Sequence, residues 1–421
     1  MNILLKSARI IAPQSEYHSK SLDILIQNGI ISDIADTVSP PEGTEIVQPK
    51  NLHVSPGWLD TSVCFGEPGY EDRETITNGL KTAAKSGFTA VLVNPNTYPV
   101  ADTNADISFL ISRSKDHATA LHPIGALTAK SESVDLAELY DMKNAGAVAF
   151  GDYQVPVSNP NLLKIALQYT SNFGGLVLSF PQENRISGKG VMNEGTTSTR
   201  LGLKGIPALA EELQVARDLF LLEYTGGKLH IPTISTARSA ELIGNAKAKG
   251  LDVSCSVAIH NLFFTDTVLE EFDTSYKVLP PLRGQEDTAA LIEGLKNGII
   301  DFVTSDHNPV DVEHKNVEFD HAMYGSTGLE SAFGALASLL GAESATQLLS
   351  KGRSRFGLTE HLIARGQKAD LTLFDPDTEY TFGREHILST SKNSAFNGQK
   401  LKGKVYGCIA NGIAEINTKQ Q

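Results

Sequence analysis

Side chains that could do chemistry stand at the ends of short apolar segments. In residues 56–72, PGWLDTSVCFGEPGYED, the residues Ser62, Cys64 and Gly66 alternate, so they share one face if the segment is a strand. Asp152 and Asp306 end two later apolar segments. Zinc needs three or four nitrogen, sulfur or carboxylate donors, and a carboxylate can also act as a general base. The sequence thus offers one thiol and two carboxylates, each from a different segment.

Each of these residues also has a structural interpretation. Cys64 is a candidate thiolate ligand, but a lone cysteine on a strand is more often a small buried hydrophobe. Asp306 is either a base or an acceptor of hydrogen bonds from neighbouring loops. For His230, His260 and His307 we expect hydrogen bonds within the site rather than metal ligation.

The elements that must position these residues alternate between strands and helices. Eight apolar segments read as strands, and amphipathic helical segments separate them. Such a series predicts a (β/α)8 TIM barrel with its site at the C-terminal ends of the strands. No GxGxxG opens a helix, which argues against a doubly wound sheet. The predicted strands lie in residues 55–65, 88–96, 121–128, 146–153, 175–181, 228–235, 251–260 and 300–307.

Both ends of the chain carry hairpin signals. Asn28-Gly29 and Asn411-Gly412 each stand between alternating apolar runs, which is typical of a β-hairpin, and residues 369–377 read as another strand. We therefore predict a small β-sandwich-like domain from residues 1–52 plus 368–421, and a barrel domain over residues 53–367.

Composition and charge restrict the classes of partner. The formal net charge of −13 argues against a nucleic-acid or anionic membrane surface, since both attract basic patches. Three cysteines without CxxC spacing indicate neither a disulfide framework nor a structural zinc site. The sequence has neither the pattern of a signal peptide nor an apolar run long enough to span a membrane, so we expect a cytoplasmic protein.

Motifs along nearly the whole chain carry a family resemblance. They include EPGYEDRETI, NPNTYPVAD, PIGALT, VAFGD, VMNEG, GIPALAEE, PPLR, TSDHNP, YGSTGLE and ADLTLFDP. In this order and spacing the chain resembles a dihydroorotase of the amidohydrolase superfamily. The resemblance implies a zinc-dependent enzyme of pyrimidine biosynthesis that interconverts carbamoyl aspartate and dihydroorotate.

The resemblance also maps the family's metal ligands onto this sequence, and most have changed. The first-strand His-x-His corresponds to Ser62 and Cys64, and the later histidine ligands correspond to Phe180 and Thr233. None of the four metal histidines is present. The strand-four carboxylate pair is reduced to Asp152.

The residues that the family uses on its substrate are also altered. Asp306 stands at the position of the family's metal ligand and general base. The arginine and the histidine that hold the substrate carboxylate correspond to Gly66 and Val310, so we expect dihydroorotate to bind poorly. Asn96 remains as a substrate contact.

Three hypotheses follow for the function. The first is a dihydroorotase-like protein with neither metal site nor catalysis, needing no cofactor, whose surface serves a structural or regulatory role. The resemblance suggests aspartate transcarbamoylase as its partner, and we also expect a homo-oligomer. The second is an active dihydroorotase or related cyclic-amide hydrolase with an unorthodox metal site. The third is a small-molecule binding protein that uses the old pocket through Asn96 and Asp306.

Overall fold

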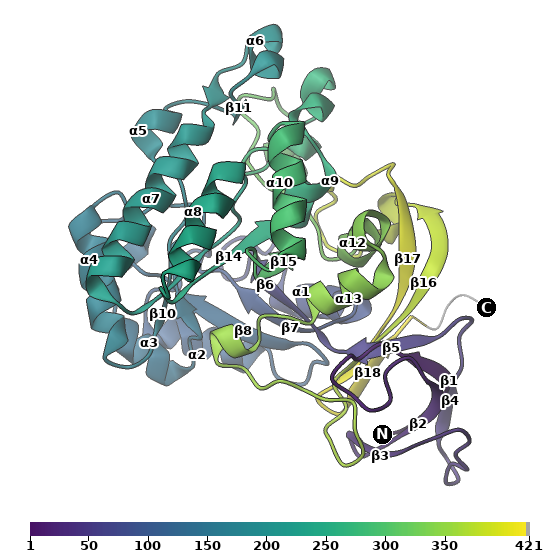
Figure 1. Ribbon diagram of the computed structural model, residues 1–421. Helices are drawn as coiled ribbons and strands as arrows, with labels where there is room; N and C mark the ends of the chain where they lie inside the picture. The colour runs from purple at the N-terminus through teal and green to yellow at the C-terminus, as the bar shows by residue number, and fades with distance from the viewer. Residues whose placement is uncertain (418–421) are drawn as a thin grey trace.

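Eight parallel strands form the centre of the molecule, in a computed structural model that describes residues 1–417 (Figure 1). The strands follow one another in chain order around the ring. The ring closes where the Cys64 amide donates to the His307 carbonyl at 2.7 Å, beside the Val63–His307 bridge. The strands are β6 (Trp58–Val63), β7 (Phe88–Val93), β8 (Ala120–Gly125), β9 (Ala149–Phe150), β10 (Leu176–Leu178), β13 (Lys228–Ile231), β14 (Val253–Ala258) and β15 (Phe302–Thr304).

Helices surround the ring, and local sequence fixes their ends. The Thr75 side chain accepts from the Asn78 amide at the start of α1, and Thr103 and Asp106 form a capping box on α2. The main helices are α1 (Ile76–Lys85), α2 (Asn104–Arg113), α3 (Leu139–Ala145), α4 (Pro160–Ser171), α7 (Ala208–Thr225), α8 (Ala237–Ala248), α10 (Gln285–Lys296), α12 (Ala332–Leu340) and α13 (Ala342–Leu349).

Short elements complete the loops around the barrel. They are α5 (Asn184–Ser187), α6 (Thr196–Leu201), α9 (Ile259–Phe263), α11 (Val312–Lys315) and the strand pair β11 (Met192–Asn193) and β12 (Gly205–Ile206). Short 3-10 helices cover Ala129–Ser131, Asp266–Glu271, Thr274–Tyr276, Ser354–Phe356 and Arg384–His386.

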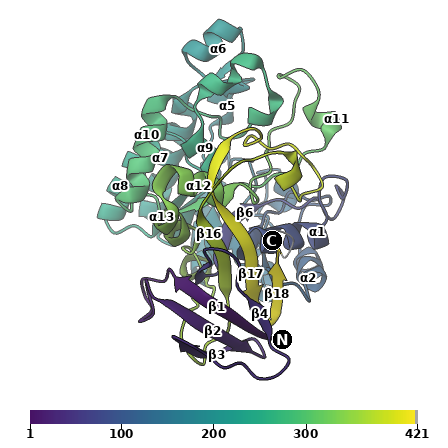
Figure 2. The same ribbon diagram turned by 90° about the vertical axis from the view of Figure 1, so that its right-hand side faces the viewer.

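The two chain ends meet in a second sheet, below the barrel in Figure 2. Asn28-Gly29 and Asn411-Gly412 form the predicted hairpin turns, with all four φ angles positive. The strands are β1 (Asn2–Ile10), β2 (Ser21–Gln27), β3 (Ile30–Ala35), β4 (Glu45–Val47), β5 (His53–Pro56), β16 (Leu371–Thr381), β17 (Lys400–Ala410) and β18 (Ile413–Ile416).

Aromatic packing joins the sheet to the barrel. Trp58 at the start of β6 is fully buried, with its ring 4.8 Å from Phe333 of α12 and 5.8 Å from Phe374 of β16. The predicted fold class, a TIM barrel with a small β-domain built from both termini, is confirmed. Among residues 1–417, no helix is both long and apolar enough to cross a membrane.

Candidate active site

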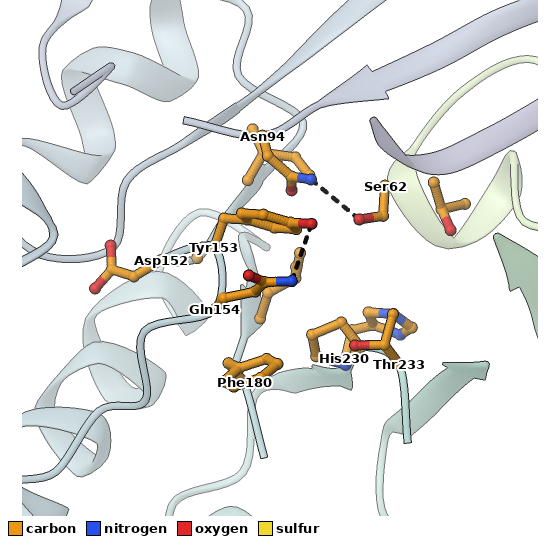
Figure 3. Close-up of a pocket in the computed structure, with 13 residues that line it drawn as sticks. Ser62, Asn94, Asp152, Tyr153, Gln154, Phe180, His230 and Thr233 are labelled. Atoms are coloured by element: carbon orange, nitrogen blue, oxygen red, sulfur yellow. Dashed lines mark hydrogen bonds between the residues drawn. The ribbon is translucent and has the colours of Figure 1, made fainter. Parts of the chain in front are cut away.

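Side chains from three neighbouring strands meet at the barrel mouth, the rim formed by the C-terminal strand ends. Ser62 Oγ, from β6, donates to Asp306 Oδ1 at 2.8 Å. The Asn94 amide, just after β7, donates to Ser62 Oγ at 3.0 Å and lies 3.6 Å from Cys64 Sγ (Figure 3). The structure therefore brings Ser62, Cys64 and Asp306 together at the mouth.

Asp306 is buried and conformationally restrained. Tyr153 OH donates to its Oδ1 at 3.3 Å, and its φ of 47° is unusual for a residue other than glycine. Burial raises the pKa of Asp306 to about 7, against the hydrogen bonds from Ser62 and Tyr153 that lower it. The carboxyl group can therefore exchange a proton near neutral pH.

A second buried carboxylate, Asp60, holds the end of β15 in place. It accepts hydrogen bonds from the Thr304 hydroxyl, the Ser305 amide at 2.9 Å and the Ser62 amide at 3.1 Å. Because these donors flank both Ser62 and Asp306, Asp60 fixes the distance between the two side chains.

Cys64 is a neutral thiol in this setting. Burial, and secondarily the charge of Asp306, raises its pKa to about 12. The thiol therefore stays protonated at neutral pH. This favours the interpretation of Cys64 as a small buried side chain.

The Asp152 carboxylate does not lie beside that of Asp306. Its side chain points away from Tyr153 and Ser62 (Figure 3). It accepts from the amides of Leu127 and Thr128 at 3.0 and 3.2 Å, and from the hydroxyls of Thr128 and Ser131 at 2.6 and 3.1 Å. Asp152 therefore anchors the loop after β8.

The remaining family ligand positions are closed to a metal. The Phe180 ring packs with Ile206, Ala210 and Leu279, and Thr233, which has a φ of 49°, lines the same pocket (Figure 3). Neither side chain is a competent zinc ligand.

The predicted substrate contacts lie beside the pocket rather than in its lining. A Cβ atom at Gly66 would stand 1.9 Å from the Tyr70 carbonyl oxygen, so no side chain fits there. Val310 is buried, and its amide donates to the Asn393 side chain at 3.0 Å. Asn96 is partly buried, and its Oδ1 has no hydrogen-bond partner among the described residues.

The three nearby histidines are buried and neutral. His230 bonds Ser254 and Ser256 at 2.9 and 3.2 Å and stacks on Phe302, while burial lowers its pKa well below the usual value. Burial also lowers the pKa of His260 to about 3 and of His307 to about 4. His307 Nδ1 accepts from the Gly328 amide at 3.1 Å.

Little open space remains at the mouth. The cavity among Ser62, Asn94, Tyr153, Phe180 and Thr233 measures about 30 Å³. This volume holds a water molecule but not a ring. Gln154 donates to Tyr153 OH at 3.1 Å and to the Leu279 carbonyl at 2.9 Å, so hydrogen bonds hold both side chains in the lining of the cavity.

Asn94, Tyr153 and Gln154 were not among the predicted site residues. Asn94 and Tyr153 stand at strand ends just as Ser62 does, and this position in the sequence could have identified them as site residues. The role of Gln154 depends on its contact with Leu279, which the sequence does not show.

Relatives of known name align with nearly the whole chain. A family described as Dihydro-orotase-like matches residues 52–239. A protein named Dihydroorotase from Pelotomaculum thermopropionicum is 41% identical over 419 residues, covering 98% of each chain. Another protein of that name, from Acetivibrio thermocellus, is 38% identical and covers 99% of each.

Solved structures share the fold at lower identity. The L-hydantoinase (dihydropyrimidinase) of Arthrobacter aurescens superposes with a TM-score of 0.83 at 21% identity, covering 99% of this chain and 98% of its own. The dihydropyrimidinase of Brevibacillus agri gives 0.81 at 19%, covering 100% and 96%. At these identities the likeness shows the fold alone.

Two expectations from the sequence were wrong. Full-length identity to proteins named Dihydroorotase contradicts the interpretation that the chain has lost catalysis and serves only as a structural or regulatory partner. The same finding overturns the expectation of no cofactor, since dihydroorotases are zinc-dependent and a metal is therefore indicated. Residue types at four ligand positions were too narrow a basis for either conclusion.

The side chains at this mouth nevertheless do not fit the family's zinc. Within residues 1–417, no three histidine, cysteine, aspartate or glutamate side chains cluster closely enough to hold an ion. The Asp152 oxygens are fully engaged elsewhere, and Phe180 fills one ligand position. We therefore assign no catalytic step to a metal ion.

Proposed function

We propose, because the chain belongs to the dihydroorotase family, that it catalyses the reversible hydrolysis of dihydroorotate to carbamoyl aspartate in pyrimidine biosynthesis. The observation that carries this proposal is the 41% identity to a protein named Dihydroorotase, which extends through the barrel and the small sheet. The geometry at the mouth supports proton transfer at one carboxyl group, Asp306.

Asp306 would move the proton in both directions of the reaction. As water attacks the ring carbonyl carbon, the carboxylate accepts one of its protons, and the new C–O bond forms. When the ring C–N bond breaks, the same carboxyl group returns that proton to the nitrogen. Ser62 and Tyr153 hold Oδ1 by hydrogen bonds, and Asn94 orients Ser62. Positioned proton transfer is worth about 10²–10⁴-fold in rate.

Substrate entry requires movement of Tyr153 and Gln154. A cavity of about 30 Å³ is far smaller than the roughly 300 Å³ at the lower end of ligand pockets. Movement of the pair would break the hydrogen bond from Gln154 to the Leu279 carbonyl and the one from Tyr153 to Asp306. Dihydroorotate would then lie over Asp306 and Ser62.

The substrate carboxylate would lack its two usual partners. Gly66 has no room for a side chain and Val310 is apolar and buried. We therefore predict weak binding, seen as a high KM. Micromolar affinity for dihydroorotate or carbamoyl aspartate in calorimetry would contradict this prediction.

The cellular setting forms part of the same proposal. Cys64, Cys255 and Cys408 are all free and buried, which supports a reducing cytoplasm. Aspartate transcarbamoylase as a partner stays a prediction, to be tested by co-purification from the native cell.

A two-direction assay tests the proposed activity. Purified protein would be assayed with dihydroorotate and with carbamoyl aspartate, after chelation and again after zinc supplementation, beside a relative named Dihydroorotase. We expect turnover by the wild type and its loss in Asp306→Asn. Absence of turnover in every condition, while the relative is active, would refute the proposal.

A further inference from the structure

A second cavity lies at the opposite end of the barrel from the mouth, where β7 and β8 begin. Its volume of about 650 Å³ falls within the roughly 300–1,000 Å³ of small-molecule sites. Thr89, near the start of β7, and His122 of β8 line it. Thr89 precedes Asn94 of the mouth by five residues, so at about 3.3 Å per residue the two sites lie about 16 Å apart.

Both domains contribute to the walls of this cavity. The chain after α13 crosses from the barrel to the small sheet, in green in Figure 1, and contributes lining residues between 353 and 370. The hairpin turns Asn28-Gly29 and Asn411-Gly412 also line it. A ligand bound here would therefore contact the barrel and the sheet at once.

The charged groups in the lining are mainly cationic. The lining contains one carboxylate and four groups that carry or can take up a positive charge, namely Arg353, Lys368, His122 and His361. The whole chain has a net charge of −13, so the cavity has the opposite sign from the body. An acidic body repels a large polyanion, whereas a small anion can approach a local cationic cavity.

The one carboxylate, Asp370, is already engaged. Its Oδ1 accepts from the Thr89 hydroxyl at 2.7 Å and from Arg353 Nη2 at 3.4 Å, and its Oδ2 lies 3.5 Å from His361 Nε2. A Cβ atom at Gly57 would stand 1.8 Å from Oδ1, so the Gly57 backbone packs directly against the carboxylate. Asp370 is therefore fixed in the wall, where it orients the Arg353 side chain.

The Arg353 guanidinium retains donors for a ligand. Only 5% of Arg353 is exposed, and its Nη2 also donates to the Thr89 hydroxyl at 2.7 Å. Within residues 1–417, its Nε and Nη1 groups make no hydrogen bond, and neither does the His122 ring. Buried polar groups normally have partners, so these donors are available to an acceptor that enters the cavity.

His122 supplies a neutral donor beside this cation. Burial, and secondarily the charge of Arg353, lowers the pKa of His122 to about 4. The neutral ring still has one N–H group to donate. Arginine matches the oxygens of a phosphate group, and lysine binds phosphate as a point charge, so this set of donors favours a phosphate group.

We propose that this cavity binds a small organic phosphate, with the phosphate group at Arg353 and His122 and with the exposed Lys368 at the rim. The remaining volume holds the organic part of the ligand. Because the ligand contacts both domains of the folded chain, its binding raises the free energy of unfolding. The site does not depend on the proposed catalytic function.

Calorimetry of the full-length protein with glucose 6-phosphate at constant ionic strength tests the site. We expect one ligand per chain with a Kd of about 1 mM or lower, weaker binding of inorganic phosphate and none of glucose. Arg353→Gln should weaken binding about 10-fold or more, because it removes charged donors, and Lys368→Gln about threefold. Lys296→Gln removes an exposed positive charge from α10, outside the lining, and is the matched control.

Two further measurements keep the test decisive. Arg353 is buried, so circular dichroism checks that its variant folds, while Lys368→Gln tests the site at an exposed residue. Crystals soaked in tungstate, a heavy oxyanion, should show anomalous density beside Arg353. Absence of saturable binding, equal affinity for glucose, an affinity unchanged in every folded variant or lowered equally in Lys296→Gln, or tungstate density only elsewhere would each overturn the proposal.

Discussion

Substitutions of Asp152 should show whether its carboxylate has a structural role or a catalytic one. Asp152→Ala removes the acceptor of four hydrogen bonds and leaves the buried amides of Leu127 and Thr128 without partners. Each orphaned buried donor costs about 1–3 kcal/mol, so we expect a loss of about 3–5 kcal/mol. A domain has only about 5–15 kcal/mol of stability, so this is a large fraction.

Asp152→Asn should be milder. The amide oxygen can still accept from both backbone amides, and its NH2 group can donate to the Thr128 hydroxyl. We expect a loss of about 1–2 kcal/mol with turnover retained at saturating substrate. Asp102, which accepts a single hydrogen bond from the Lys130 amide at 2.7 Å, offers a control in Asp102→Ala with a smaller effect.

Urea unfolding followed by fluorescence measures these changes. Trp58 is the only tryptophan and is fully buried between barrel and sheet, so its emission reports the loss of that packing. A shift in midpoint at constant slope gives the free-energy change. If Asp152→Asn abolished turnover without moving the midpoint, Asp152 would be a site residue and our assignment would be refuted.

Three further predictions concern titratable groups. Asp306→Asn should lower turnover at least about 100-fold yet keep the fold, because asparagine tolerates a positive φ; a loss below tenfold would remove Asp306 from proton transfer. Burial lowers the pKa of His260 to about 3 and of His122 to about 4. As pH falls below about 6.5, both histidines therefore become protonated in the unfolded chain while they stay neutral in the folded one. Together they should reduce the free energy of unfolding by about 2.7 kcal/mol per pH unit down to about pH 4, and an unchanged slope in His260→Leu would contradict this. Burial lowers the pKa of Lys315 to about 7, so its contribution to stability should rise with pH from about 7 to 10; unfolding of Lys315→Met across that range should show a flatter dependence, and an identical one would refute the assignment.

The fold could be predicted because local patterns and global topology agree. Alternating strand and helix signals gave all eight barrel strands, and Asn-Gly turns gave both terminal hairpins. These features depend on residues close together in the sequence. The confirmed fold class rests on this agreement.

The site was less predictable because distant contacts decide it. β9 is only two residues long, so the direction of the Asp152 side chain depends on Thr128 and Ser131, more than twenty positions earlier. The position of Gln154 in the pocket lining depends likewise on its hydrogen bond to the Leu279 carbonyl. Neither contact leaves a pattern in the local sequence.

The wrong expectation of a non-catalytic protein has a related cause. The changes at Ser62, Cys64, Phe180 and Thr233 describe metal ligation, and they say nothing of the groups that transfer protons. Proton transfer depends on Asp306, on Tyr153, which donates to it, and on Asn94, which donates to Ser62. Neither Tyr153 nor Asn94 was among the predicted site residues. The 41% identity to a protein named Dihydroorotase extends over 419 residues, so it is a broader basis for the function than the four ligand positions.

The surroundings of Asp306 support retention of a proton-transfer role. Burial chiefly, and the nearby buried carboxylate Asp60 to a smaller extent, raise the pKa of Asp306, and Asp306 also holds a left-handed φ. Both features cost folding free energy, and such strain persists only where surrounding contacts enforce it. Here the contacts of Asp306 are hydrogen bonds from Ser62 and Tyr153 to its carboxylate and from its own amide to the Thr304 hydroxyl at 3.2 Å. A chain that used this mouth only for packing would gain stability from an apolar pair at the two positions, so the costly carboxylates are better explained by chemistry at Asp306.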